Sequence, residues 1–220
     1  MRLRALVVLV TLAIVISLPI VHAYGLATYH GGSKPSKYKT IVPKKSVTSS
    51  KNPEVKTAQI PKKIQIDKSK FKKAPPLSGI SGYINTDKNA IYSEMKNKVI
   101  LYDFWTYGCY NCQNTIPYIK AWYDKYADKG LLIIGIHTPE FEFEKDIGNV
   151  KQAVVKSDIK FPVVLDNDEQ NWRAFENHYW PRFYLADSDG YIRYDHIGEG
   201  SYDETEQAIQ QLLKERNDSA

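Results

Sequence analysis

The most informative segment of the 220-residue sequence reads Asp103-Phe-Trp-Thr-Tyr-Gly-Cys109-Tyr-Asn-Cys112. It holds the only two cysteines of the sequence, in a Cys-x-x-Cys spacing. The apolar run Val99–Trp105 at its start predicts a buried strand, and Gln113–Tyr126 behind it predicts a helix. Because the N-terminus of a helix carries unpaired N–H groups and a partial positive charge, it stabilises a thiolate. This placement favours a reactive first cysteine.

The rest of the C-terminal region predicts strands and helices in alternation. Residues 80–85 and 90–95 read as a short strand or hairpin around a turn at 86–89. Further strands are predicted at 131–137, 161–165, 182–186 and 191–195, and helices at 143 or 146 to 157, 169–177 and 202–216, the last with Asp203 as its N-cap. Asp187-Ser-Asp-Gly190 predicts the tight turn of a hairpin. We expect an α/β domain with a mixed sheet flanked by helices.

Composition divides the chain into three parts: residues 1–23, 24–76 and 77–220. The first is basic and then apolar, and the second is a Lys/Pro/Ser-rich stretch expected to be a flexible, disordered linker with 13 Lys against two acidic residues. The third has 15 Lys and Arg against 23 Asp and Glu, a net charge of −8. The overall charge of +5 therefore reflects the linker, and the acidic domain argues against nucleic acid as a partner.

The N-terminal apolar run covers residues 5–21 and predicts export. As a helix it would be about 26 Å long, at the lower limit for crossing a bilayer. The sequence up to Ala23 also fits a signal peptide cleaved near that residue. Both interpretations, a membrane anchor and a secreted protein, place the cysteines outside the cytoplasm, where disulfides persist. The basic linker is a candidate second contact with an anionic membrane surface.

Several features together resemble the thioredoxin fold. They are Asp103-Phe-Trp105, the Cys-x-x-Cys pair, Pro117 five residues after the second cysteine, and Trp180-Pro181 before the predicted hairpin. Within that fold the chain resembles the TlpA-like and DipZ-like thiol–disulfide oxidoreductases. The segments that carry this resemblance are Phe104-Trp-Thr-Tyr, Gly135-Ile-His-Thr-Pro-Glu-Phe-Glu-Phe-Glu-Lys145 and Leu165-Asp-Asn-Asp168. The resemblance covers about residues 77–216 and implies that no cofactor is required.

A redox role is the favoured interpretation of the cysteine pair. Cys109 is the expected nucleophile and the more exposed thiol, and Cys112 is the expected resolving thiol. A zinc site would need further ligands, and the sequence has no second cysteine pair, so no metal is predicted. Gln113 replaces the histidine of a covalent haem motif. A structural disulfide across so short a loop would constrain the unfolded chain little.

The resemblance also implies roles for residues outside the pair. In the family, the position of Asp103 is a buried carboxylate under the disulfide, which accepts the proton of the resolving thiol; the alternative is a solvent-facing Asp. Pro181 is the expected cis proline, and the backbone of Trp180 would pair with a bound substrate. An ordinary trans proline is the alternative at that position.

Four more residues are candidates for substrate binding: Trp105, Tyr107, Tyr110 and His137. Trp105 is expected to pack against the active-site turn, or simply in the core. Tyr107 and Tyr110 flank Cys109 and suggest an aromatic rim, although exposed aromatics in loops are often neutral. His137 ends a strand at the sheet edge that carries the cysteines, so it either lines the site or is a satisfied histidine at a strand end.

The sequence thus predicts an extracytoplasmic thiol–disulfide oxidoreductase that acts on protein thiols and exchanges electrons with a separate membrane or soluble donor or acceptor. Reduction of apocytochrome c during cytochrome c maturation is the role that the resemblance suggests. A thiol peroxidase is an alternative because Thr106 lies three residues before Cys109, although the peroxidatic proline is missing. A copper carrier using both sulfurs and His137 is a second alternative. The direction of electron flow is open.

Overall fold

The computed structural model describes residues 67–219, which belong to one compact unit. The predicted N-terminal apolar segment and all but the last residues of the predicted linker lie outside the described residues. The elements are β1 (Gly82–Ile84), α1 (Lys88–Glu94), β2 (Val99–Trp105), α2 (Tyr110–Tyr126), η1 (Ala127–Lys129), β3 (Leu131–His137), η2 (Glu142–Lys145), α3 (Ile147–Lys156), β4 (Val163–Leu165), α4 (Gln170–Ala174), β5 (Arg182–Ala186), β6 (Ile192–Ile197) and α5 (Tyr202–Ser219). Between residues 67 and 219, no helix combines the length and apolarity needed to cross a membrane.

The strands form one mixed sheet in the order β1-β4-β3-β2-β5-β6. β2, β3 and β4 run parallel, whereas β5 is antiparallel to β2 and to β6, and β1 is antiparallel to β4. β2 and β3 are buried along their whole length, as expected for central strands covered on both faces. The predicted α/β class and mixed sheet are confirmed.

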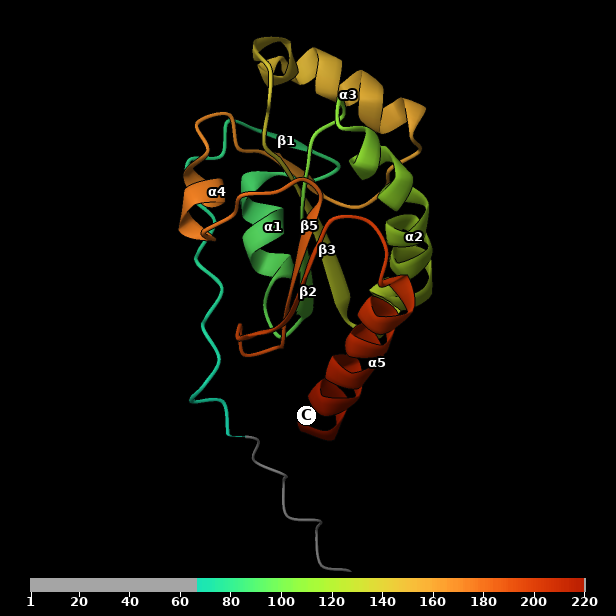
Figure 1. Ribbon diagram of the computed structural model, residues 1–220. Helices are drawn as coiled ribbons and strands as arrows, with labels where there is room; N and C mark the ends of the chain where they lie inside the picture. Colours follow the sequence, from blue (N-terminus) through green and yellow to red (C-terminus); the bar gives the residue numbers. More distant parts are fainter. Residues whose placement is uncertain (1–66, 220) are drawn as a thin grey trace, which may run out of the picture. The chain divides into compact units, whose positions relative to one another are not determined.

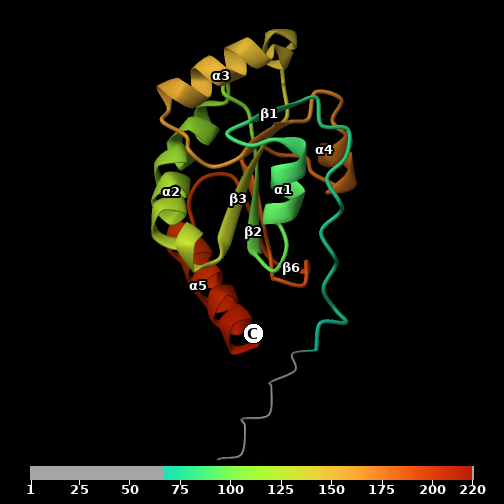
Figure 2. The same ribbon diagram turned by 180° about the vertical axis from the view of Figure 1, so that it is seen from behind.

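Helices cover both faces of the sheet (Figures 1 and 2). Successive side chains of β2 alternate between the faces. Leu101 and Trp105 pack with α2, α3 and α5, in a cluster that includes Trp122, Val150 and Ile209. Tyr102 and Phe104 pack on the opposite face with Ile91 of α1 and with Phe175, which follows α4. Two apolar cores therefore hold β2 in place along its length.

Residues 90–95 correct one prediction: they belong to helix α1 and its C-terminus rather than to a strand or hairpin. The carboxylate of Asp87 caps this helix by accepting hydrogen bonds from the N–H groups of Asn89 (2.8 Å) and Ala90 (2.9 Å). Ile91 is its buried anchor. A short helix with a single buried residue shows little hydrophobic periodicity in its sequence. The N-cap residue Asp87 is the local signal that indicates this helix.

Most other elements lie where the sequence predicts them, with small corrections. Of the two predicted starts of the next helix, 143 and 146, the second is right: Asp146 is extended and caps α3, and residues 142–145 form the separate η2. Gly190 adopts φ +83° in the hairpin turn, as the turn requires. α5 begins at Tyr202, so Asp203 lies in its first turn and is not its N-cap. The buried face of α5 is formed by Ile209, Leu212 and Leu213.

Residues 67–76 contact the folded domain, although the sequence placed them in the linker. Ala74 N donates to Gly190 O (2.8 Å), and Ile192 N donates to Lys72 O (2.9 Å). Lys68 pairs with Asp187 (2.8 Å) and Asp189 (2.7 Å) of the hairpin turn. We call residues 67–76 the strap; its contacts begin ahead of the predicted boundary at residue 77.

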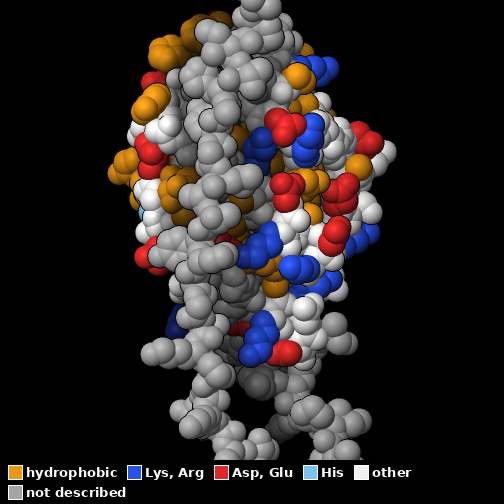
Figure 3. Space-filling view, turned by 90° about the vertical axis from the view of Figure 1, so that its right-hand side faces the viewer, with side chains coloured by type: hydrophobic (Ala, Val, Ile, Leu, Met, Phe, Trp, Pro, Cys, Tyr) orange, Lys and Arg blue, Asp and Glu red, His pale blue; other side chains and the backbone are white. Residues whose placement is uncertain are grey.

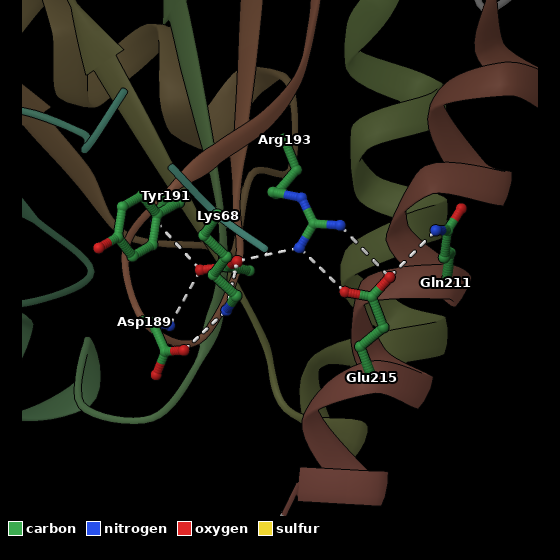
Figure 4. A network of polar contacts seen from close by, with 7 residues as sticks. Lys68, Asp189, Tyr191, Arg193, Gln211 and Glu215 are labelled. Atoms are coloured by element: carbon green, nitrogen blue, oxygen red, sulfur yellow. Dashed lines mark hydrogen bonds and ion pairs between the residues drawn. The ribbon is translucent and has the colours of Figure 1, made fainter. Parts of the chain in front are cut away.

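A chain of charged side chains joins the strap to α5 through the hairpin (Figure 4). Arg193 of β6 pairs with Asp187 at 3.1 Å and with Glu215 of α5 at 3.0 Å. The side chain of Arg193 is only 10% exposed, and that of Asp187 only 5%. Figure 4 shows Lys68 on one side of Arg193 and Glu215 on the other. Lys68, Asp187, Arg193 and Glu215 thus connect three separate parts of the chain.

Candidate active site

The candidate active site lies at one edge of the sheet, where three strand ends meet. Trp105 ends β2 opposite His137, which ends the parallel strand β3. Arg182 begins the antiparallel strand β5 beside Phe104. The loop after β2, the loop after β3 and the loop before β5 therefore converge at this edge. They carry the cysteine pair, the 138–141 segment and Pro181, respectively.

Cys109 and Cys112 form a disulfide with a Cα–Cα distance of 5.2 Å. Cys109 is the N-cap of α2, and its Sγ accepts a hydrogen bond from Cys112 N at 3.1 Å. Cys109 is half-buried, whereas Cys112 is completely buried. Thiol–disulfide exchange requires an approach to sulfur, and Cys109 is the cysteine with the greater exposure. The predicted order of exposure is confirmed.

Asp103 is a buried carboxyl group in the middle of β2. It is 1% exposed, and its Oδ1 has no hydrogen-bond partner among the described residues. By strand alternation its side chain lies on the same face as Trp105, the face whose core includes Cys112. Burial raises the pKa of Asp103 to about 8. A carboxyl group with this pKa can take up or release a proton near neutral pH. The alternative of a solvent-facing Asp103 is wrong.

The Trp180–Pro181 peptide bond is cis, as predicted. Pro181 is buried, and its carbonyl accepts a hydrogen bond from Gly198 N at 2.8 Å. The half-buried Trp180 packs against Trp172, with ring centroids 4.1 Å apart. The tryptophan pair therefore fixes the side of the loop that faces α4.

The predicted aromatic residues separate into a core residue and two rim residues. Trp105 is 2% exposed and belongs to the core, and the little surface that it keeps lines a pocket together with Tyr107 and Gln113. Its indole Nε1 would lie 2.9 Å from a Cβ at position 135, so Gly135 leaves the space that the indole occupies. Tyr110 is 72% exposed, and Tyr107 is half-buried. These two tyrosines flank Cys109 in the chain and remain candidates for the rim.

His137 is completely buried, and the prediction that it lines a substrate-binding surface is therefore wrong. Its ring stacks on Tyr107 at 5.6 Å and meets Trp105 edge-on at 5.3 Å. Its Nε2 lies 3.3 Å from Thr106 Oγ1 and accepts a hydrogen bond from Tyr107 N at 3.4 Å. Burial lowers the pKa of His137 to about 4, which keeps the ring neutral. His137 thus supports the active-site turn through its contacts with Thr106 and Tyr107.

Glu144 is a residue of the site that the sequence analysis missed. It is completely buried in η2, and its Oε1 accepts a hydrogen bond from Gly108 N at 2.9 Å. Its Oε2 accepts from Glu140 N at 2.7 Å and from Phe141 N at 3.1 Å. A Cβ at position 108 would collide with Oε1. The segment Glu140-Phe-Glu-Phe-Glu144 offers three carboxylates, and its sequence does not tell which one turns inward.

Comparison with known proteins supports a redox site. The model of the Redoxin family matches residues 70–213. The chain is 44% identical over 144 residues to "Protein DipZ" of Mycobacterium tuberculosis, a match that covers 64% of this chain and 21% of that protein. It is 29% identical over 143 residues to the "Thiol-disulfide oxidoreductase YkuV" of Bacillus subtilis, covering 64% of this chain and 94% of the relative.

Solved structures agree with the fold. A thioredoxin-like protein determined in solution in its oxidised form superposes with a TM-score of 0.59 at 28% identity, covering 66% of this chain and 97% of that one. The predicted thioredoxin-like fold is thus confirmed for the described region. The chain spans only about a fifth of the length of the DipZ proteins that it matches.

Proposed function

Because this chain belongs to the Redoxin family, whose model spans residues 70–213, we propose that it is a thiol–disulfide oxidoreductase that exchanges its Cys109–Cys112 disulfide with the thiols of other proteins. The observation that carries this proposal is the disulfide itself, at the start of α2, with one half-exposed and one buried sulfur. The YkuV relative, which matches along most of its length, is named for the same chemistry.

In the reducing direction, the Cys109 thiolate attacks a disulfide of the substrate. One substrate sulfur leaves as a thiolate, takes up a proton, and a mixed disulfide with Cys109 remains. The Cys112 thiol then loses its proton, and its thiolate attacks Cys109 Sγ, which releases the second substrate sulfur. The second substrate sulfur also leaves as a thiolate and takes up a proton, so that two electrons have moved to the substrate and the enzyme is left with the disulfide seen here. Oxidation of a substrate dithiol is the reverse sequence.

Asp103 is the proposed acceptor of the Cys112 proton. It is buried on the face of β2 whose core contains Cys112, and its pKa of about 8 is in the range of a thiol. Pro181 and the Trp180 backbone are the proposed site for an extended substrate chain, beside Cys109 at the same sheet edge. Tyr107 and Tyr110 form the rim that such a chain would meet.

The proposed setting is extracytoplasmic. It rests on the apolar residues 5–21, as an anchor or as a signal peptide cleaved near Ala23, followed by a basic linker that would tether the domain. Outside the cytoplasm the enzyme would depend on a separate electron donor or acceptor. The similarity to DipZ and to the "Thiol-disulfide oxidoreductase ResA" of Bacillus cereus makes reduction of apocytochrome c cysteines a candidate role.

The decisive measurement is the reduction potential of the Cys109–Cys112 couple, combined with trapping of the mixed disulfide. A potential of about −270 mV supports a reductant, and one of about −120 mV supports an oxidant. Cys112→Ser should accumulate a mixed disulfide with a substrate protein, whereas Cys109→Ser should form none. The proposed mechanism is wrong if Cys109→Ser retains disulfide exchange.

Two alternatives are tested by the same protein preparations. A thiol peroxidase would consume hydrogen peroxide at a rate that depends on Cys109, and Thr106 would have to face that sulfur. The Thr106 hydroxyl instead lies beside His137 Nε2. A copper carrier would bind Cu(I) through both reduced sulfurs, and titration of the reduced protein would detect it. The buried His137 packs between Trp105 and Tyr107 and gives that alternative no support.

A further inference from the structure

Two phenylalanines are exposed beside the active-site turn. Phe141 is 50% exposed and Phe143 is 57% exposed, in the segment between β3 and α3. Their rings stack with centroids 5.5 Å apart and planes 5° from parallel. The Phe143 ring lies 6.3 Å from the ring of Tyr107. We call Tyr107, Phe141 and Phe143 the aromatic platform.

The backbone holds the platform in this exposed position. Phe141 N donates to the buried carboxylate of Glu144, which also binds Gly108 N. Phe143 O accepts hydrogen bonds from Tyr107 Oη (3.3 Å) and from Asn149 Nδ2 (3.0 Å). These hydrogen bonds tie the backbone of both phenylalanines to the active-site turn, and their rings remain exposed. An exposed apolar patch on a fixed backbone is typical of a binding site.

The platform is continuous with the reactive sulfur along the chain, because Tyr107 precedes Cys109 by two residues. Its border is acidic: Glu140, Glu142 and Asp146 are exposed, and Lys145 is already paired with Glu142 at 2.7 Å. Figure 3 shows the face on the right-hand side of Figure 1, where acidic, basic and hydrophobic side chains are interspersed. A complementary partner is apolar at its centre and basic at its border.

We propose that the aromatic platform is a docking surface for polypeptide substrates that carry an apolar side chain, with a lysine or arginine near it, close to the cysteine that reacts with Cys109. This inference rests on the proposed oxidoreductase function and adds a substrate preference to it. Burial of an aromatic or aliphatic side chain against the two rings selects the substrate, and exchange at Cys109 follows. The acidic border adds attraction for basic neighbours.

The preference is measured as the ratio of kcat/KM for two peptide substrates. In this ratio, differences between preparations in the fraction of active protein cancel. One peptide disulfide carries Phe and Lys beside its cysteine, and the other carries Ser and Glu at the same positions. For the wild-type protein we expect kcat/KM for the first peptide to exceed that for the second by roughly tenfold, the effect of burying one aromatic side chain in part. In the Phe141→Ser/Phe143→Ser variant the ratio should fall to about 1–2.

A matched control keeps the test specific. Val155→Ser removes an apolar side chain that is 79% exposed on α3 and lies outside the platform, so this variant should keep the wild-type ratio. The single variants Phe141→Ser and Phe143→Ser should each lower the ratio by an intermediate amount. A ratio near 1 for the wild-type protein, or an unchanged ratio in the double variant, would overturn the docking surface while exchange persists. Absence of exchange with both peptides in the wild-type protein would overturn the proposed function as well.

Discussion

Gly108 N donates a hydrogen bond to Glu144 Oε1 at 2.9 Å, which joins the residue before Cys109 to the segment after β3. The other oxygen of the same carboxylate binds two further backbone N–H groups. One buried side chain thus fixes the active-site turn and the aromatic platform relative to each other. Three N–H donors replace the hydration of this buried carboxyl group, and among residues 67–219 no cationic side chain pairs with it.

We expect Glu144→Ala to lower the free energy of unfolding by about 3 kcal/mol, because it leaves three buried N–H groups without their acceptor. Urea denaturation measures this loss. The matched control is Glu142→Ala, which removes an exposed carboxylate with one surface ion pair and should cost less than about 1 kcal/mol. Equal losses in both variants would contradict a structural role for the buried carboxylate.

Asp103 makes the stability of the oxidised protein depend on pH. Its pKa is about 8 in the folded state, above the unfolded value of about 3.9. The folded state therefore binds more protons between these values, and stability falls as the pH rises from about 4 to about 8, with no further loss above. In urea unfolding, the wild-type protein should lose a few kcal/mol more unfolding free energy between pH 5 and pH 8 than the Asp103→Asn variant does. The exposed Asp128→Asn variant should keep the wild-type loss, and the same decrease in both variants would exclude Asp103 as its source.

His137 has the opposite dependence. Burial lowers its pKa to about 4, below the unfolded value of about 6.5, so its contribution to stability is present above about pH 6.5 and is lost as the pH falls toward 4. Between pH 6.5 and pH 4 the wild-type protein should lose on the order of 3 kcal/mol of unfolding free energy through this residue, and His137→Phe should not show this loss. His178 is exposed, and His178→Gln should leave the pH dependence unchanged. Thermal unfolding at pH 4.5 and 7 distinguishes these outcomes.

Arg193 is the centre of the ion-pair chain between the strap and α5. Arg193→Ala leaves Asp187 and Glu215 without this partner in a poorly exposed position, and we expect a loss of about 3 kcal/mol in unfolding free energy. Arg173→Ala removes an exposed arginine with one surface pair and should cost less than about 1 kcal/mol. If the two variants unfold at the same urea concentration, the ion-pair chain contributes little to stability.

The sequence predicts the parts of the fold that carry strong local signals. Val99–Trp105 and Leu131–His137 are continuous apolar runs, and both strands have these bounds in the structure. The turn at Gly190 and the redox pair are equally local signals. The cis bond at Pro181 is predicted from the resemblance to the thioredoxin fold, because the local sequence does not distinguish a cis from a trans proline.

What could not be predicted depends on tertiary packing. A polar residue at a strand end can be exposed or buried, and the neighbours that bury His137 come from the turn after another strand. The inward turn of Glu144 requires its N–H donors, one of which lies 36 residues earlier in the chain. The lysine-rich strap looks like linker by composition, and only the partners on the hairpin show that it is attached.

The strap and the reactive edge lie at opposite ends of the sheet. β5 begins at the site, beside Pro181, and ends at the hairpin turn to which Lys68 is bound, so the chain joins the domain at the end of the sheet opposite Cys109 (Figure 1). The described part of the chain therefore starts at the end of the sheet remote from the disulfide. A protein that reacts with Cys109 thus meets the domain at the end that the strap does not occupy.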